Sequence, residues 1–440
     1  MNKKVYIETL GCQMNKSDTE RILGILELEG YEETKDSKAA NLLIINTCSI
    51  RGASEDKAYS HLGVWGKRKR KNPEMNIKIA MCGCVAQQTK EQIFRRAPYV
   101  DLIFGTHNID ELPKLIKKVE EDEKVCSIHK TQYKDENGGF MIKRKEGISA
   151  WLPIIEGCDY FCTYCVVPHT RGRQRSRLPQ EIINEAREIA KEGFKEIILL
   201  GQTVDSYGKD LDDETATLSY LLKEINKIDE VIRIRFLTSH PADMDEELIK
   251  TVAGLDKVCE YFHIPMQSGS DAILEKMRRP YTRAEFLDLV NMIKKYMPEV
   301  GITSDFIAGF PGETEEDFND TLSIIDEVVF DYCNGAAYSP RRQTPAAVWK
   351  NQLPTEEKKQ RLYILNDKIK EAIQITNDRC VGKTMEILVD GVNEKGELNM
   401  NGRTRSNKIV HFIGDKSLIG TLINVKITEA APWCLKGEIV

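Results

Sequence analysis

Residues 156–165 read EGCDYFCTYC, and this stretch carries the strongest pattern in the sequence. Cys158, Cys162 and Cys165 form a C-x3-C-x2-C run directly after LPIIEG, an apolar segment typical of a buried strand. Thiolates on a tight loop are the expected ligands of an iron–sulfur centre, each holding one iron. Three such ligands leave one iron of a cubane open to a small molecule with an amine and a carboxylate. The alternatives are a zinc loop, with His169 as the nearby fourth ligand, and buried structural cysteines.

A series of strand and helix patterns surrounds and follows this loop. The strand-like segments are LPIIEG, EIILLGQ, VIRIRFLTS, YFHIPM, ITSDFIAGF and CNGAAYS, with helical patterns between them. Such a series predicts a partial (β/α)6 barrel of the TIM type, whose working face lies at the carboxyl ends of the strands. We place this domain at residues 144–374.

Residues 1–118 also alternate apolar strands with helices, which predicts an open parallel α/β domain covered on both faces. The capping-box pattern Ser17-Asp-Thr-Glu20 predicts the start of the first helix. Residues 119–143 are charged and contain a glycine pair, and we interpret them as a linker. Residues 375–440 contain short strands separated by turn signals, which predicts a small OB-like β-barrel.

Three cysteines of the N-terminal domain form a second pattern. Cys12, Cys48 and Cys84 are evenly spaced, and each ends a predicted strand, at the same point of successive strand–helix units. Ligands bind at the carboxyl ends of parallel strands, so three thiolates converging there predict a second cluster with an open iron. Buried structural cysteines are the alternative. Cys82 competes with Cys84 for the third position, but we favour Cys84 because it lies beyond the strand end and fits the regular spacing.

The composition limits the class of protein. The chain has 440 residues, 41% hydrophobic and 30% charged, and no apolar run approaches the roughly 18 residues of a membrane span. The first residues lack the apolar core of a signal peptide, so we expect a cytoplasmic protein that does not associate with a membrane. In a reducing compartment, 12 cysteines more often bind metal or perform redox chemistry than form disulfides. The net charge of −6 is compatible with local basic patches but not with a strongly basic surface. We expect a monomer, because the sequence leaves no hydrophobic stripe without a place in the predicted elements.

These motifs resemble the methylthiotransferases of the radical S-adenosylmethionine (SAM) superfamily along essentially the whole chain. The matching motifs are TLGCQMN (9–15), NTCSIR (46–51), GCVAQ (83–87), EGCDYFCTYCVVPHTRGRQRSR (156–177), HIPMQSGS (263–270), DFIAGFPGET (305–314) and YSPRRQTPAA (338–347). Two departures are GQTVDSY, where GQNVNSY is usual, and the extra Cys82. Neither changes a predicted cluster ligand.

The resemblance implies a radical SAM enzyme with two 4Fe-4S clusters and SAM as cofactors. By resemblance, the SAM-binding cluster is held by Cys158, Cys162 and Cys165, and the auxiliary cluster by Cys12, Cys48 and Cys84. One SAM would yield the radical that takes hydrogen from the substrate, and a second SAM would supply the methyl group of the methylthio unit.

Within the family, the residues resemble the branch that methylthiolates carbon 2 of N(6)-dimethylallyladenosine at position 37 of tRNA, next to the anticodon. The branches that modify a ribosomal protein or another tRNA adenosine usually differ after the equivalents of Cys12 and Cys48. They stay as alternatives, as does a non-catalytic iron–sulfur protein that binds RNA. The implied partners are the tRNA anticodon stem-loop, a reducing electron donor and iron–sulfur assembly or carrier proteins.

The resemblance also suggests SAM contacts near the ends of the barrel strands, although no catalytic residue follows from it. The candidates are Gly201, Gln202, Arg235, Ser239, Gln267 and Asp305. The DFIAGFPGET turn has a structural explanation as well, because Thr314 with Asp317 has the pattern of a helix cap.

Basic residues supply candidates for RNA contact. Four arginines alternate after the cysteine loop, at positions suited to phosphate contact: Arg171, Arg173, Arg175 and Arg177. The segment GRTRSNKIVHF (402–412) resembles the TRAM domain, an RNA-binding module, and offers Arg403, Arg405 and Phe412 for backbone and stacking contacts. The runs Lys67–Lys71 and Arg341-Arg342 fit either RNA contact or a solvated surface.

Overall fold

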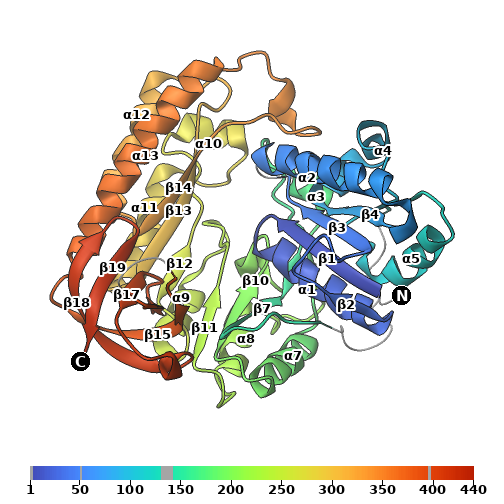
Figure 1. Ribbon diagram of the computed structural model, residues 1–440. Helices are drawn as coiled ribbons and strands as arrows, with labels where there is room; N and C mark the ends of the chain where they lie inside the picture. The colour runs from blue at the N-terminus through green and yellow to red at the C-terminus, as the bar shows by residue number, and fades with distance from the viewer. Residues whose placement is uncertain (1–2, 50–51, 130–141, 395–397) are drawn as a thin grey trace.

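The computed structural model describes residues 3–49, 52–129, 142–394 and 398–440 (Figure 1). An N-terminal α/β part, blue in Figure 1, lies beside a central barrel, and a small C-terminal barrel, red, packs against the other side of the central one. In the described part of the chain, no helix combines the length and the hydropathy of a membrane span.

The N-terminal part is a parallel sheet with strand order β2-β1-β3-β4-β5-β6. Its strands are β1 (Lys3–Leu10), β2 (Tyr31–Glu33), β3 (Leu42–Thr47), β4 (Lys78–Gly83), β5 (Leu102–Phe104) and β6 (Val125–Ser127). Its helices are α1 (Gln13–Leu28), α2 (Gly52–Lys71), α3 (Cys84–Thr89), α4 (Gln92–Arg96) and α5 (Leu112–Glu120). Apolar side chains of α1 and α5 cover one face of the sheet, and those of α2 to α4 cover the other. The predicted open parallel sheet is confirmed.

Two local predictions in this part are wrong. Helix α1 begins at Gln13, four residues before Ser17, so the predicted capping box lies inside the helix. Its Asp18 is buried there because it meets an arginine from the central barrel. The predicted linker 119–143 contains the end of α5 and the edge strand β6, which pairs with β5. Most of the remaining linker, residues 130–141, lies outside the described residues.

The central part is an open (β/α) barrel, and each of the predicted strands is present. Its strands are β7 (Ser149–Pro153), β10 (Glu196–Leu200), β11 (Arg233–Phe236), β12 (Tyr261–His263), β13 (Gly301–Ala308) and β14 (Tyr332–Ala337). The parallel sheets β7-β10-β11 and β12-β13-β14 join at a bridge between Ile234 and Val258. A short antiparallel pair, β8 (Ile155–Glu156) and β9 (Arg175–Ser176), flanks the cysteine loop together with α6 (Val167–Thr170).

Helices cover the outside of this barrel, and its inside is polar. The helices are α7 (Pro179–Lys191), α8 (Leu218–Ile225), α9 (Glu246–Gly254), α10 (Asp271–Met277), α11 (Arg283–Tyr296), α12 (Glu315–Val328) and α13 (Thr355–Asp378). Successive side chains of a strand point to opposite faces. Because Ile234, Phe262 and Phe306 belong to the core under the helices, their neighbours Arg235, His263 and Asp305 face inward.

The C-terminal part is a closed barrel with order β15-β16-β17-β19-β18. Its strands are β15 (Thr384–Val392), β16 (Met400–Thr404), β17 (Ile409–Phe412), β18 (Leu422–Ala431) and β19 (Cys434–Ile439). The predicted small β-barrel is confirmed, although its predicted start at residue 375 falls inside α13. That helix continues to Asp378 because its inner side chains, among them Ile369 and Ile373, complete the core of the central barrel.

Candidate active site

Cys12, Cys48 and Cys84 lie together at the carboxyl edge of the N-terminal sheet. They follow β1, β3 and β4, which are neighbours in the sheet and end in register. The Cys48 thiol makes hydrogen bonds with both Cys12 and Cys84. The equal spacing in the sequence therefore corresponds to a row of three neighbouring thiols, with Cys48 between Cys12 and Cys84.

The charge state of these thiols suits metal binding. Contact with Cys48 and, to a smaller extent, the nearby Arg171 guanidinium lower the pKa of Cys12 to about 6 and the pKa of Cys84 to about 7. The pKa of Cys48 itself is raised by the same two hydrogen bonds. Thiolates are the form in which cysteine binds metals.

Cys82 occupies a different place from Cys84. It is 1% exposed and packs in the apolar core between the sheet and helices α1 and α5. Burial raises its pKa well above the usual range of a thiol. Cys84 is the residue that meets Cys12 and Cys48, so Cys82 is structural.

The second cysteine set lies on the loop between β8 and α6. Thr203 Oγ1 donates to Cys158 Sγ at 3.4 Å, and Arg279 Nη1 donates to Cys162 Sγ at 3.7 Å. Burial raises the pKa of Cys158, and it raises the pKa of Cys165 to about 12. Ionisation of these thiols therefore needs a bound cation, which deprotonates a coordinating thiol outright.

Both donor sets fit an iron–sulfur cluster better than a single metal ion. Among the described residues, no three Cys, His, Asp or Glu side chains surround a point that could hold one ion. A cluster needs no such point, because each thiolate holds a different iron. His169, the only candidate for a fourth zinc ligand, is exposed at the end of α6. The zinc alternative has no support in this geometry.

The backbone that presents the second cysteine set is tightly constrained. Gly157 precedes the first cysteine with φ +78°, and a Cβ there would collide with the carbonyl oxygen of Arg173. Gln202 Oε1 accepts a hydrogen bond of 2.6 Å from the Gly157 backbone N–H. Gly201 is buried, and a side chain at that position would collide with Ile155. Gly201 and Gln202 thus have a structural role in holding the cysteine loop, whether or not they also contact SAM.

Polar atoms without partners lie beside this loop. Ser239 Oγ and His240 Nε2 are buried and have no hydrogen-bond partner among the described residues. The ring of His240 stacks on Tyr160 of the cysteine loop, with ring centroids 3.6 Å apart. Buried polar groups are nearly always satisfied, so these atoms indicate the place of a polar ligand. The position of Ser239 is compatible with the predicted SAM contact.

The other SAM candidates have different positions. Each of the three guanidinium nitrogens of Arg235 donates a hydrogen bond within the protein. The acceptors are Glu196 and the backbone carbonyls of Thr404 and Arg405. Arg235 is buried and joins the two barrels, so its guanidinium is directed to the C-terminal barrel and not to the strand ends where SAM is expected, which corrects that prediction. Gln267 adopts φ +76° and pairs its backbone with β13, with its side chain half-buried. Asp305 lies inside the barrel, midway along β13.

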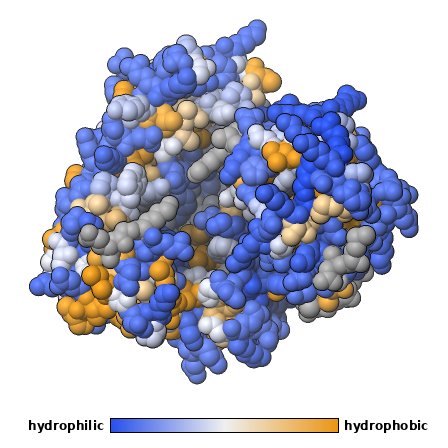
Figure 2. Space-filling model, in the orientation of Figure 1, coloured by the Kyte–Doolittle hydropathy of each residue, from blue (hydrophilic) through white to orange (hydrophobic). Residues whose placement is uncertain are grey.

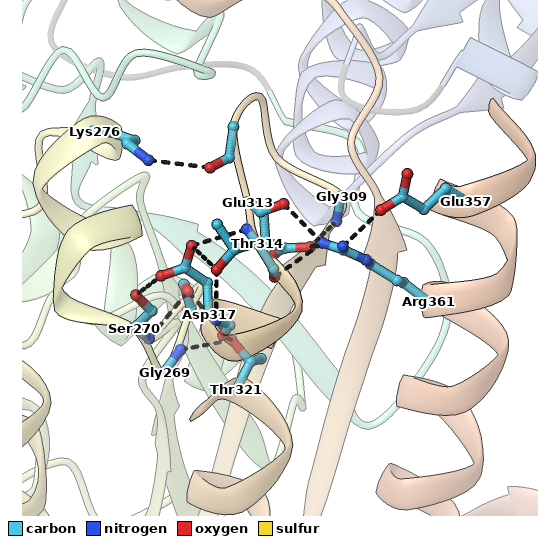
Figure 3. A network of polar contacts seen from close by, with 12 residues as sticks. Gly269, Ser270, Lys276, Gly309, Glu313, Thr314, Asp317, Thr321, Glu357 and Arg361 are labelled. Carbon is cyan, nitrogen blue, oxygen red and sulfur yellow. Dashed lines mark hydrogen bonds and ion pairs between the residues drawn. The ribbon is translucent and has the colours of Figure 1, made fainter. Parts of the chain in front are cut away.

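The turn after β13 is held by a network of polar contacts (Figure 3). Thr314 and Asp317 form the predicted capping box of α12. The Glu313 carboxylate accepts from the Gly309 N–H and from Arg361 of α13, at 2.8 and 2.6 Å. Asp317 also accepts from Ser270, so this turn is tied to the segment that follows β12. The network explains the motif DFIAGFPGET by structure alone.

The segments that carry the two cysteine sites meet at a contact between the N-terminal part and the central barrel. Arg171, six residues after Cys165, forms a bidentate ion pair with Asp18 of α1, with hydrogen bonds of 3.2 and 2.5 Å. Helix α3, which begins with Cys84, packs against α6, which follows Cys165. Gln88 of α3 donates at 2.7 Å to the carbonyl of Arg342, which lies in the segment after β14. Figure 2 shows the molecule hollowed between the N-terminal part and the barrels, so a large substrate can approach.

Each of the four arginines predicted to bind phosphate after the cysteine loop has an acidic partner within the protein. Arg171 is 3% exposed and paired with Asp18, which corrects its assignment to RNA. Arg175 pairs with Glu156, and the side chain of Arg177, 15% exposed, pairs with Glu185. Arg173 pairs with Asp159, but 70% of its side chain is exposed. Of the four, Arg173 has the position best suited to an external phosphate.

The C-terminal candidates also serve the domain contact. Arg405 pairs with Glu260 and donates to the carbonyls of Asp256 and Val258, at the amino-terminal end of the central barrel. Phe412 is fully buried in the core of the small barrel and cannot stack on a base. Both assignments are corrected. Arg403 pairs with Asp390, and 38% of its side chain is exposed.

Some residues of the site have no counterpart in the sequence prediction. Arg279 reaches Cys162 from the start of the segment after α10, and Thr203 reaches Cys158 from the loop after β10. Lys16 of α1 lies over the ring of Trp151 on β7, at 5.3 Å. His263 enters the sequence prediction only as part of the motif HIPMQSGS. Its inward position follows from the strand alternation around Phe262, which is the signal that could have identified it.

Family profiles match three segments of the chain. Residues 152–325 match the Radical SAM superfamily, residues 4–105 match the Uncharacterized protein family UPF0004, and residues 378–440 match the TRAM domain.

Similarity extends over the full length in curated relatives. The chain is 44% identical to a protein of Clostridium perfringens named tRNA-2-methylthio-N(6)-dimethylallyladenosine synthase, over 100% of this chain and 98% of that protein. The chain belongs to this synthase family. A synthase of the same name from Geobacillus kaustophilus is 46% identical, over 100% of this chain and 82% of the relative.

Solved structures show that the fold of this synthase also occurs in proteins of much lower sequence identity. The radical S-adenosylmethionine methyltransferase TsrM from Kitasatospora setae superposes with a TM-score of 0.57 at 14% identity, covering 79% of this chain and 74% of that chain. The cobalamin-dependent S-adenosylmethionine radical enzyme OxsB gives a TM-score of 0.55 at 13% identity, covering 84% of this chain and 56% of that chain. At this identity the likeness concerns the fold alone.

Proposed function

We propose that the protein is a radical SAM methylthiotransferase that modifies carbon 2 of N(6)-dimethylallyladenosine in tRNA, at the position next to the anticodon. The observation that carries the proposal is the presence of two separate three-cysteine sites, whose neighbouring segments are joined by the Arg171–Asp18 contact. Full-length identity to synthases of that name supports the choice of substrate.

In this proposal each part of the chain has its own role. Residues 1–118 hold an auxiliary 4Fe-4S cluster on Cys12, Cys48 and Cys84. Residues 144–374 hold the SAM-binding 4Fe-4S cluster on Cys158, Cys162 and Cys165, and residues 375–440 contribute to RNA binding. Together with SAM, the bound clusters would supply two groups. One is a radical that removes a hydrogen atom from the substrate, and the other is a sulfur that carries a methyl group.

The protein's own residues position these groups and the substrate. Arg279 and Thr203 donate hydrogen bonds to cluster-site sulfurs, and such bonds tune the potential of an iron–sulfur centre. Ser239 offers a hydroxyl to SAM, and Arg173 and Arg403 offer charge to RNA phosphates. A cytoplasmic setting with a reducing electron donor and iron–sulfur carrier proteins completes the proposal.

The test is an anaerobic assay of the reconstituted protein with SAM, a strong reductant and anticodon stem-loops. One loop carries N(6)-dimethylallyladenosine, one carries adenosine and one carries N(6)-threonylcarbamoyladenosine. We expect a methylthio nucleoside, identified by mass spectrometry, from the prenylated loop. Release of 5′-deoxyadenosine without a modified nucleoside would indicate that the substrate is that of another branch of the family. The absence of both products would refute the enzymatic proposal.

A further inference from the structure

An exposed aromatic pair lies where the small barrel meets the edge of the central barrel. Trp433, in the turn between β18 and β19, and Tyr332, at the start of β14, have ring centroids 6.1 Å apart, with an angle of 69° between the rings. Both residues remain open to solvent, because Trp433 is 58% exposed and Tyr332 is 41% exposed. Large aromatic side chains usually bury most of their surface, so an exposed pair of them indicates a contact surface for a partner.

Tyr332 faces the inside of the central barrel. Its neighbour Cys333 belongs to the core under the outer helices, and successive side chains of a strand point to opposite faces. The Tyr332 hydroxyl donates to Asn334 Oδ1 at 3.1 Å on this inner face, which fixes the direction of the ring. Because β14 is the last strand of its sheet, its inner face borders the opening of the barrel.

The turn that carries Trp433 is held firmly by α13. Only Pro432 and Trp433 lie between the paired residues Ala431 and Cys434. Asn377 Nδ2 donates to the carbonyls of Ala431 and Pro432, at 2.7 and 3.2 Å. The backbone is therefore fixed while the indole ring projects into solvent, so a flat ligand can bind to it at a low cost in conformational entropy.

A cation lies beside the aromatic pair. Lys370 of α13 is exposed, and none of the described residues forms an ion pair or hydrogen bond with its amine. It lies one turn after Asn366, whose Oδ1 would be 2.6 Å from a Cβ on Gly335 of β14. It also lies one turn before Gln374, which donates to the Ala430 carbonyl near the end of β18. Lys370 thus belongs to the stripe of α13 that runs from β14 to the small barrel (Figure 1).

This combination of groups fits an unpaired nucleotide of RNA. The base of such a nucleotide stacks on an aromatic ring, and its phosphate is attracted to a cation. A nucleotide inside a stem has both faces covered by its neighbours, so only an unpaired one can use the indole ring. In the proposed function, the anticodon loop of the tRNA supplies unpaired nucleotides.

The distance from the strand ends indicates which nucleotide can bind. Tyr332 precedes Ala337, the last residue of β14, by five positions, which is about 17 Å at the rise of a strand. An adenine whose carbon 2 is modified beyond the strand ends is therefore too far away to stack on Trp433. The aromatic pair is suited to another nucleotide of the same loop, a few positions along the RNA strand.

We propose that Trp433, Tyr332 and Lys370 bind a second, unpaired nucleotide of the anticodon loop. The indole ring stacks on the base, the Tyr332 ring supports the indole, and the Lys370 amine contacts the phosphate. This inference rests on the proposed function and adds to it a site that holds the loop while the adenine lies at the strand ends. It also gives the C-terminal barrel an aromatic contact in place of the buried Phe412.

The test locates the stacked nucleotide by removing one base at a time. Anticodon stem-loops with N(6)-dimethylallyladenosine carry a single abasic nucleotide at each other loop position in turn. Their binding to the reconstituted holoenzyme is measured by fluorescence anisotropy. We expect a position at which loss of the base weakens binding about tenfold, the effect of one stacked base. Trp433→Ala should bind the intact loop about tenfold more weakly and should show no further loss at that position.

The comparison separates stacking from folding. Each ratio compares two RNAs on the same variant, so a folding defect weakens both alike and leaves the ratio unchanged. Trp433→Phe retains a ring and should keep most of the difference between the two RNAs. Ile413→Ala is the matched control, because Ile413 is 68% exposed and lies at the other end of the β17–β19 pair from the Trp433 turn. It should behave as the wild-type protein does.

The phosphate contact is tested through the salt dependence of binding. Lys370→Ala should reduce the slope of log affinity against log salt concentration by about 0.7, the value for one phosphate of a single strand. The affinity ratio between the intact and the abasic loop should stay at about tenfold in this variant, because the indole ring is still present. An unchanged slope would overturn the assignment of Lys370.

The remaining results have distinct meanings. If Trp433→Ala still loses affinity at the same abasic position as the wild-type protein, the stacking contact lies elsewhere and the inference is overturned. A wild-type protein that methylthiolates the prenylated loop, but loses no affinity when any other loop base is removed, also overturns it and leaves the proposed function intact. A wild-type protein that neither prefers the prenylated loop nor forms the methylthio product contradicts the proposed function itself.

Discussion

Arg171 and Asp18 form a buried ion pair that joins the loop after the second cysteine set to the helix that follows Cys12. The two side chains are 3% and 8% exposed and share two hydrogen bonds. The positive charge of Arg171 also lowers the pKa of Cys12 and Cys84. This residue pair is thus one of the contacts that fix the relative position of both candidate cluster sites.

Loss of one partner of this pair should be costly. Arg171→Ala leaves the Asp18 carboxylate buried and unpaired, which costs about 3–5 kcal/mol in comparable pairs. We expect the midpoint of thermal unfolding to fall clearly, while Arg173→Ala, at an exposed position in the same segment, should change it little. Equal midpoints for the two variants would show that the buried pair does not hold the domains together.

The cysteine assignment predicts a difference between two close positions. Cys84→Ala should lower the iron and sulfide content of the reconstituted protein by about half, because one of two clusters loses a ligand. Cys82→Ala should leave the content unchanged and cause only a modest loss of stability, since it removes a small buried side chain. If Cys82→Ala lost the iron and Cys84→Ala kept it, the assignment would be reversed.

His240 predicts a pH dependence of stability. Burial lowers its pKa to about 2, well below the ordinary value of 6.5, so the folded protein keeps this ring neutral. Below pH 6.5 the unfolded chain binds the proton more readily than the folded one, and stability falls by about 1.4 kcal/mol per pH unit. In His240→Asn this part of the acid sensitivity should be missing. The check is the thermal midpoint of both proteins between pH 7.5 and pH 5; parallel curves would refute it.

The contact between the two barrels predicts different roles for two nearby arginines. Arg405→Ala removes the ion pair with Glu260 and two bonds to carbonyls, so we expect faster hydrogen exchange along β16 and β17. Arg403→Ala should leave exchange unchanged and weaken RNA binding, more so at low salt. Faster exchange in the Arg403 variant alone would contradict these assignments.

Local patterns in the sequence predicted most elements of the fold and the meeting of Cys12, Cys48 and Cys84 at one edge of the sheet, while their binding of a cluster stays a prediction. Each of Cys12, Cys48 and Cys84 ends a strand of a parallel sheet, and geometry brings such ends together without further information. The same reasoning separated Cys84 from Cys82, because only Cys84 lies beyond the strand end.

Predictions that depended on partners from distant parts of the chain failed. The charge of Arg171 or Arg405 does not reveal that Asp18 or Glu260 will lie beside it. Phe412 is different, because it lies two residues after the buried Val410 with the half-buried His411 between them, an alternation that places it in the core. The inward direction of Arg235 was also readable from the strand, but its contact with the C-terminal barrel was not.

The central claim, that carbon 2 of a tRNA adenine reaches the barrel site, can be tested by following one atom. The reconstituted protein receives SAM, a reductant and a stem-loop with deuterium at carbon 2 of its dimethylallyladenosine, and the products are analysed by mass spectrometry. We predict deuterium in the 5′-deoxyadenosine that accompanies each methylthio product. A methylthio product with deoxyadenosine free of deuterium, or deuterium retained on the base, would contradict the account.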